Sequence, residues 1–204
     1  MADQGVGQPG GERAPRADAK RNEGRVLTAA QDLLTRGGVD GLSMAEVAEV
    51  AGVGVGTVYR RFGDRAGLLL AVMNQREAEL QAACRVGDPP LGPGAPPAAR
   101  VIAFLTAYAD ILEDFGEVMA AAEAKMDHHR RFRTGPYHAH WTHLRQLISE
   151  AAPAVDADYL ADAFLQPLTG AIFVQQRRND GVDLERIKDG IGQLVGQVLD
   201  PSRR

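Results

Sequence analysis

Residues 43–62 read SMAEVAEVAGVGVGTVYRRF, and this stretch decides the fold. Ser43 and Glu46 have the spacing of a capping box, which predicts that a helix begins at Ser43. Gly52 ends that helix, and a second short helix is predicted over residues 54–61. Two short helices joined by a tight glycine turn indicate a helix-turn-helix.

The flanking sequence supplies a helix on either side. Apolar residues recur at helical spacing from about residue 18 to 36, and Gly37-Gly38 then ends the helix, because glycine accepts the left-handed conformation. Asp64 is a favourable N-cap for a fourth helix, whose apolar residues run from Leu68 to Leu80. The helix-turn-helix is therefore the centre of a small helical domain.

The sequence of residues 25–72 resembles the N-terminal domain of the tetracycline-repressor (TetR) family almost position by position. The most specific part runs from Ala51-Gly52-Val53 through the segment 56–62 to Asp64-Arg65. The resemblance implies an all-α fold, with an N-terminal three-helix helix-turn-helix DNA-binding domain and a C-terminal helical ligand-binding and dimerisation domain. It also implies a sequence-specific transcriptional regulator, a repressor that a small-molecule effector releases from its operator.

The resemblance implies DNA contacts at the positions that match. Ser43, which opens the second helix, is expected to contact a phosphate, although a plain N-cap role is the alternative. Thr57 and Tyr59 are expected against the DNA backbone or nearby bases, and the alternative for Tyr59 is core packing. Arg65 stands where relatives usually have Lys and is expected at a phosphate. Val58 and Phe62 are assigned to the core.

The start of the recognition helix departs from the family pattern. Gly54-Val55 replaces a polar pair, so the Val55 side chain can offer only an apolar contact, which we expect to be with a thymine methyl group, and Ala45 is similarly limited. Arg60 is then the main candidate for reading a base, with phosphate binding as the alternative for it and for Arg61. The full set of predicted DNA contacts is Lys20, Arg25, Ser43, Ala45, Val55, Gly56, Thr57, Tyr59, Arg60, Arg61 and Arg65.

The composition is that of an ordinary globular protein. The formal net charge of −4 argues against a protein that is basic throughout, but the N-terminal cations are clustered, and distribution matters more than the sum. Cys84 is the one cysteine, which excludes a disulfide framework within one chain and a cysteine-based zinc finger. We find neither a secretory signal nor a run of about 20 apolar residues, so we expect a cytoplasmic protein without a membrane span.

The chain is predicted to have four parts. Residues 1–17 form a disordered tail, residues 18–81 the DNA-binding domain, residues 82–97 a Pro/Gly-rich linker, and residues 98–204 the effector-binding and dimerisation domain. Beyond the linker, helical periodicity predicts helices at 98–114, 116–130, 136–151, 157–178 with a kink at Pro167, and 183–199.

The family resemblance assigns dimerisation to the last two long helices and an effector pocket to the others. Packing within the monomer is the alternative for both sets of residues. The predicted dimer contacts are Leu160, Phe164, Leu168, Ile172, Leu184, Ile187, Ile191, Leu194 and Val198. The candidate pocket lining is Phe104, Tyr108, Met119, Trp141, Phe164 and Phe173.

All five histidines fall within residues 128–143, and His140 and His143 lie one helical turn apart. They lack ordered spacing to carboxylate or thiolate partners, so we predict no metal site and no cofactor. No catalytic motif is present, which argues against an enzyme. The expected partners are double-stranded operator DNA, a second copy of the chain and an unidentified small organic effector; the alternative is a DNA-binding regulator controlled by a metal or a protein partner.

Overall fold

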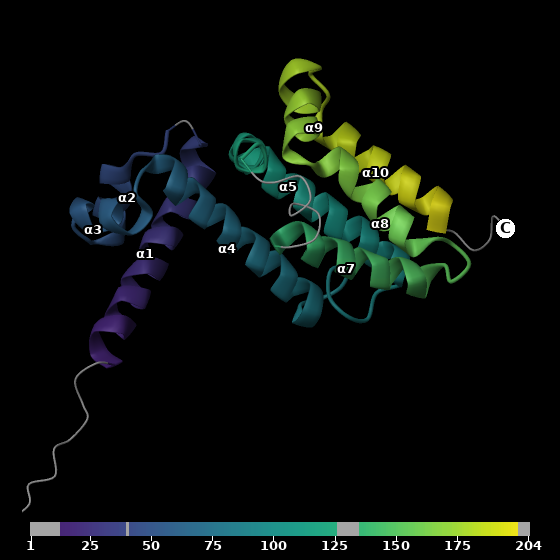
Figure 1. Cartoon of the computed structure of the whole chain (residues 1–204), viewed down its shortest axis with the longest axis horizontal. Coiled ribbons are helices and arrows are strands. Elements are labelled where there is room, and N and C mark those ends of the chain that lie inside the picture. Colours follow the sequence, from purple (N-terminus) through teal and green to yellow (C-terminus); the bar gives the residue numbers. More distant parts are fainter. Residues whose placement is uncertain (1–12, 40, 126–134, 200–204) are drawn as a thin grey trace, which may run out of the picture. The chain divides into compact units, whose positions relative to one another are not determined.

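The structure is a computed structural model that describes residues 13–39, 41–125 and 135–199, with the backbone alone for residues 13–17. The described residues form nine α-helices and no strand, which confirms the all-α prediction (Figure 1). None of these helices combines the length and apolar character needed to cross a bilayer. The chain divides into two compact units, with the boundary in the sequence between Leu68 and Leu69.

The first unit contains α1 (Arg13–Gly37), α2 (Met44–Ala51), α3 (Val55–Phe62) and the start of α4 (Arg65–Val86). Helix α2 packs on both α1 and α3. The core of the unit is a layer of small and medium apolar side chains, which holds α2 against α1 and α3: Val26, Ala29, Ala30, Leu42, Met44, Val47, Ala48, Ala51, Val58 and Leu68. Phe62, predicted to lie in the core, is only half-buried.

Helix α1 begins earlier than predicted. Residues 13–17 were assigned to a disordered tail, but their backbone is the first turn of α1; residues 1–12 of that tail lie outside the described residues. The reason is composition, since the segment RAPRADAKR is rich in Ala and Arg, which are strong helix formers. Pro15 is tolerated because the first turn of a helix has no partner for its N–H groups.

The second unit is built around α5 (Pro97–Glu123), which packs against α7 (Gly135–Ala151), α9 (Gly170–Val174) and α10 (Leu184–Leu199) (Figure 1). Helix α8 (Ala157–Leu165) packs on α7. The C-terminal part of α4 also belongs to this unit.

Three predicted helices of this unit are corrected. Residues 98–114 and 116–123 are one helix, because Gly116 faces a close neighbour instead of ending α5: a Cβ there would lie 3.3 Å from a methyl carbon of Val174. Residues 157–178 are not one kinked helix. Pro167 lies in a 3₁₀ turn, Gln166–Leu168, which ends α8, and α9 is followed by a π-helical turn at Gln175–Asn179.

The border between the units also differs from the predicted linker. Helix α4 ends at Val86 and α5 begins at Pro97, so the Pro/Gly-rich segment does separate two helices. The border, however, lies inside α4, because the end of α4 is tied to α5. Arg76 pairs with Asp114 at 3.5 Å, and the Arg100 guanidinium donates to the Cys84 carbonyl at 2.8 Å.

Candidate nucleic-acid interface and ligand pocket

The turn between α2 and α3 is fixed by backbone hydrogen bonds. Gly52 adopts the left-handed conformation (φ 61°), its N–H donates to the Glu49 carbonyl, and the Val53 N–H donates to the Ala48 carbonyl, both at 3.0 Å. This is the Schellman pattern that ends a helix at glycine. The Arg25 guanidinium donates to the Gly52 carbonyl at 3.3 Å, so this candidate DNA contact also braces the turn.

Ser43 occupies the N-cap of α2 with extended backbone, but its hydroxyl makes no capping hydrogen bond. The capping box predicted from Ser43 and Glu46 is therefore absent, although the helix does begin where it was predicted to begin. The Ser43 side chain is exposed. Its hydroxyl is free to donate to a phosphate, and the helix N-terminus behind it favours an anion.

Helix α3 turns one face inward and one outward. Val58 is fully buried, whereas Val55 and Tyr59 are 44% and 51% exposed. Gly56 and Arg60 share the outward face, and Thr57 is half-buried. Core packing, the alternative for Tyr59, is excluded by this exposure. The outward face has the chemistry expected of a recognition helix: an apolar contact, a phenol and a guanidinium side by side.

The two arginines of α3 differ in their surroundings. Arg61 pairs with Glu23 of α1 at 2.6 Å, which partly neutralises it and directs it toward α1. Among the described residues, Arg60 is exposed and has neither an ion pair nor a side-chain hydrogen bond. Arg60 is therefore the better placed of the two to reach DNA. Lys20 and Ala45 are exposed as well.

Arg65, predicted at a phosphate, has a structural function in this fold. Its guanidinium donates to the Leu42 carbonyl at 3.0 Å and to the Val39 carbonyl, so it holds the loop that leads into α2. Asp64 is confirmed as an N-cap, because its carboxylate accepts from the Gly67 N–H at 2.8 Å. Sequence reasoning missed both the Arg65 loop contacts and the Glu23–Arg61 pair, since neither follows from local periodicity.

Comparison with known proteins agrees with this geometry. Residues 26–72 match the family model described as "Bacterial regulatory proteins, tetR family". The chain carries the DNA-binding domain of the TetR family. An HTH-type transcriptional regulator of Staphylococcus aureus (strain MRSA252) is 38% identical over 66 residues, which are 32% of this chain and 35% of that protein. The chain thus matches about a third of the length of its curated relatives.

Solved structures extend the likeness to the whole fold. A TetR transcriptional regulator of Streptomyces coelicolor superposes with a TM-score of 0.56 at 23% identity, covering 88% of this chain and 98% of that one. The regulator FadR of Bacillus subtilis, solved in complex with stearoyl-CoA, has a TM-score of 0.51 at 12% identity, covering 85% and 97%. The two-unit helical architecture of this chain is that of TetR-family regulators.

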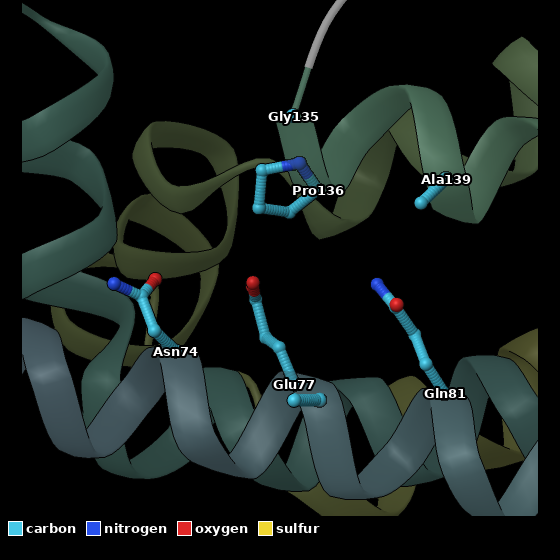
Figure 2. Close-up of a pocket in the computed structure, with 7 residues that line it drawn as sticks. Asn74, Glu77, Gln81, Gly135, Pro136 and Ala139 are labelled. Carbon is cyan, nitrogen blue, oxygen red and sulfur yellow. The ribbon is translucent and has the colours of Figure 1, made fainter. Parts of the chain in front are cut away.

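In the second unit, α4 and α7 line an open pocket of about 360 Å³ (Figure 2). Asn74, Glu77, Ala78 and Gln81 line it from α4, and the start of α7 lines it with Gly135, Pro136 and Ala139. None of the six residues predicted to line an effector pocket is in this set. Five of those six, Phe104, Tyr108, Met119, Phe164 and Phe173, are buried in the core of the unit, and the sixth, Trp141, lies between His138 and Arg145.

One histidine is buried in the core and a second is half-buried beside it. His140 is buried between Phe104 and Tyr108, with ring centroids 5.3 and 4.6 Å away, and His143 lies 5.2 Å from Phe104. Burial, and to a lesser extent the nearby His143, lowers the pKa of His140 to about 4. His128 and His129 lie outside the described residues. Within the described part of the chain, no three His, Cys, Asp or Glu side chains are grouped as metal ligands.

The predicted dimer contacts separate into two groups. Phe164, Leu168 and Ile187 are buried within the single chain, which favours the alternative of packing within the monomer for these three. They point inward because α8, the 3₁₀ turn and α10 need them for their own packing. Ile172 and Leu194 remain 41% and 48% exposed. The others are half-buried and stay candidates: Leu160, Leu184, Ile191 and Val198.

Proposed function

We propose that this protein is a sequence-specific transcriptional regulator that binds operator DNA as a homodimer. In this proposal it is a cytoplasmic repressor without catalytic activity, and a small organic effector releases it from DNA. The observation that carries the proposal is the outward face of α3, where Val55, Tyr59 and Arg60 are exposed within a TetR-family domain.

Specificity is assigned to Arg60 and Val55. An arginine can bind guanine O6 and N7 with two hydrogen bonds, and a valine can contact only a thymine methyl group. The backbone of α3 near Gly56 and the side chains of Ser43, Thr57 and Tyr59 would hold the helix against phosphates, which fix orientation without reading sequence. Arg61 contributes less, because its charge is shared with Glu23.

Control by an effector is supported by two features. The second unit has a pocket whose volume lies within the range of small-molecule sites, about 300–1,000 Å³. Helix α4 continues without interruption from Arg65, beside the helix-turn-helix in sequence, to Val86, and its middle lines that pocket. Suppose that a ligand binds more tightly to one arrangement of α4 than to another. Its preference for that arrangement would then set how much it changes the affinity for operator DNA. A regulator of similar fold binds stearoyl-CoA, so the fold accommodates an organic ligand.

The experiment is selection of operator sequences from genomic fragments, followed by affinity measurements with Arg60→Ala. If Arg60 binds a guanine, the variant loses roughly 1–3 kcal/mol of binding free energy at one base pair and binds random DNA nearly as well as before. Equal weakening on operator and random DNA would instead identify Arg60 as a phosphate contact.

Arg65→Ala is the matched comparison on the same surface. Because Arg65 holds the carbonyls of Val39 and Leu42, its loss should lower the free energy of unfolding by about 1–3 kcal/mol, whereas Arg60→Ala should leave stability unchanged. Thermal unfolding of both variants separates the two effects. Failure of the wild-type protein to select any sequence from the fragments would overturn the proposed function.

A further inference from the structure

Glu77 occupies a position where the sequence pattern calls for an apolar residue. It lies four residues after Met73 and three before Leu80, both buried, in the stripe by which α4 packs into the second unit. Glu77 is 2% exposed, and its Oε1 atom has no hydrogen-bond partner among the described residues. A buried carboxylate oxygen without a partner is costly, so the position calls for a functional explanation.

The pocket between α4 and α7 supplies that explanation. Figure 2 shows Glu77 pointing from α4 toward Pro136, with the Asn74 and Gln81 side chains on either side of it directed toward α7. The opposite wall consists of the start of α7, where Pro136 and Ala139 offer only apolar side chains. One acidic group thus lies between two amides, beneath an apolar wall.

We infer that this pocket binds an organic ligand through a protonated nitrogen, which Glu77 holds in a charge-assisted hydrogen bond. Asn74 and Gln81 orient polar groups of the same ligand, and the wall formed by Pro136 and Ala139 contacts its apolar part. This inference rests on the proposed function in one respect: it takes the bound ligand to be the effector. It names the chemical class of the effector: an amine or amidine attached to an apolar group.

The charge of Glu77 decides between ligand classes. An anionic ligand would meet the buried carboxylate of Glu77, and like charges repel. A cation supplies the missing partner of Oε1 and favours the ionised carboxylate. Burial raises the pKa of Glu77 to about 7, and a cation beside the carboxylate would favour its ionised form.

The test uses the full-length protein and three probe pairs that differ in one group: benzylamine and benzyl alcohol, 2-phenylethylamine and 2-phenylethanol, and 1-naphthylmethylamine and 1-naphthylmethanol. Affinities are measured by calorimetry at neutral pH. At least one amine is expected to bind about ten- to a hundredfold more tightly than its alcohol, the range of one hydrogen bond to a charged group. Carbon-13 labelled alanine methyl groups report the place, since Ala78 and Ala139 line the pocket.

Glu77→Gln keeps the shape of the side chain and removes its charge, so it should abolish the preference for the amine. Glu79→Gln is the matched control, because Glu79 lies on the same helix, is exposed and does not line the pocket; it should keep the preference. The inference is overturned if no amine is preferred by the wild type, if the preference survives Glu77→Gln, or if the two alanine methyl resonances do not move on amine binding.

The methyl resonances are read in the wild-type protein, so they decide the matter even if Glu77→Gln does not fold. Operator binding by the same preparation separates this inference from the proposed function. If the protein binds its operator but shows no preference for amines, only the proposed class of ligand is refuted. If the protein prefers amines but binds no operator, only the proposed function as a regulator is refuted.

Discussion

Glu77 and His140 are buried titratable side chains of the second unit, and burial shifts their pKa values in opposite directions. It raises the pKa of Glu77 from 4.5 to about 7 and lowers that of His140 from 6.5 to about 4. Glu77 therefore contributes stability below pH 4.5 that is lost as the pH rises toward 7. His140 contributes stability above pH 6.5 that is lost as the pH falls toward 4. Between about pH 4.5 and 6.5 the two effects oppose each other.

Removing either residue should expose the effect of the other. We predict that the free energy of unfolding of Glu77→Gln rises with pH between 4.5 and 6.5, and that of His140→Phe falls, each by roughly 1 kcal/mol per pH unit relative to the wild type. Denaturant unfolding at several pH values measures this. Curves for the two variants that run parallel to the wild-type curve would show that neither residue is buried as the structure has it.

Apart from the capping box at Ser43, which is absent, residue-level predictions from the sequence were right where a local rule applied and wrong where a distant partner decided. The N-cap at Asp64 and the glycine turn at Gly52 depend on backbone geometry within a few residues, and both were predicted correctly. Glu77 was overlooked, although an acidic residue between Met73 and Leu80 on one helical stripe was visible in the sequence. Periodicity marks a stripe as buried, but not which of its positions border a pocket.

At the scale of elements, α5 and α9 owe their close packing to glycine. A Cβ at Gly170 would lie 2.5 Å from the backbone nitrogen of Ala120, and one at Gly116 would lie 3.4 Å from a ring carbon of Phe173. The first contact is with backbone, which cannot yield without moving α5. The second is with the edge of a side chain, which can shift by a few tenths of an ångström.

Gly170→Ala should therefore destabilise the protein by about 1–3 kcal/mol, as overpacking of a tight interface does. Gly116→Ala is the control within the same helix pair. It should cost less, because alanine also raises the helix propensity of α5 by roughly 1 kcal/mol. Thermal unfolding of the two variants compares them, and equal stability of Gly170→Ala and the wild type would contradict the close approach of α9 to Ala120.

The same glycines explain which element boundaries the sequence could predict. The Pro/Gly-rich segment between α4 and α5 ends both helices, because proline at that density excludes helical hydrogen bonding. Gly116 does not end α5, because packing against α9 offsets the conformational entropy that a glycine loses when it folds into a helix. A glycine that breaks a helix and one that lets a neighbour approach look alike in a single sequence.

At the scale of the whole molecule, a helix-turn-helix regulator needs two recognition helices about 34–36 Å apart to read two half-sites. The described residues hold one such helix, α3, and in the proposed function a second copy of the chain supplies the other. Within the second unit, the large apolar side chains of the predicted dimer stripe that stay exposed are Ile172 and Leu194, 41% and 48%. Leu194 lies on α10, whose buried side, including Ile187 and Val195, faces its own chain. The free side of α10 is accordingly the surface we assign to the partner.

Leu194→Asp tests that assignment without disturbing the folding of the single chain, because the side chain is half exposed before any partner binds. A symmetric interface would bury the new charge twice, so we expect monomers in sedimentation with unchanged helix content. Operator affinity should fall by roughly a hundredfold or more, since two linked half-site contacts become one, although every DNA-contacting residue is intact. Arg186→Asp puts the same carboxylate on an exposed position of α10 outside the stripe and should remain dimeric. A Leu194→Asp protein that stays dimeric and binds its operator normally would place the dimer interface on other helices.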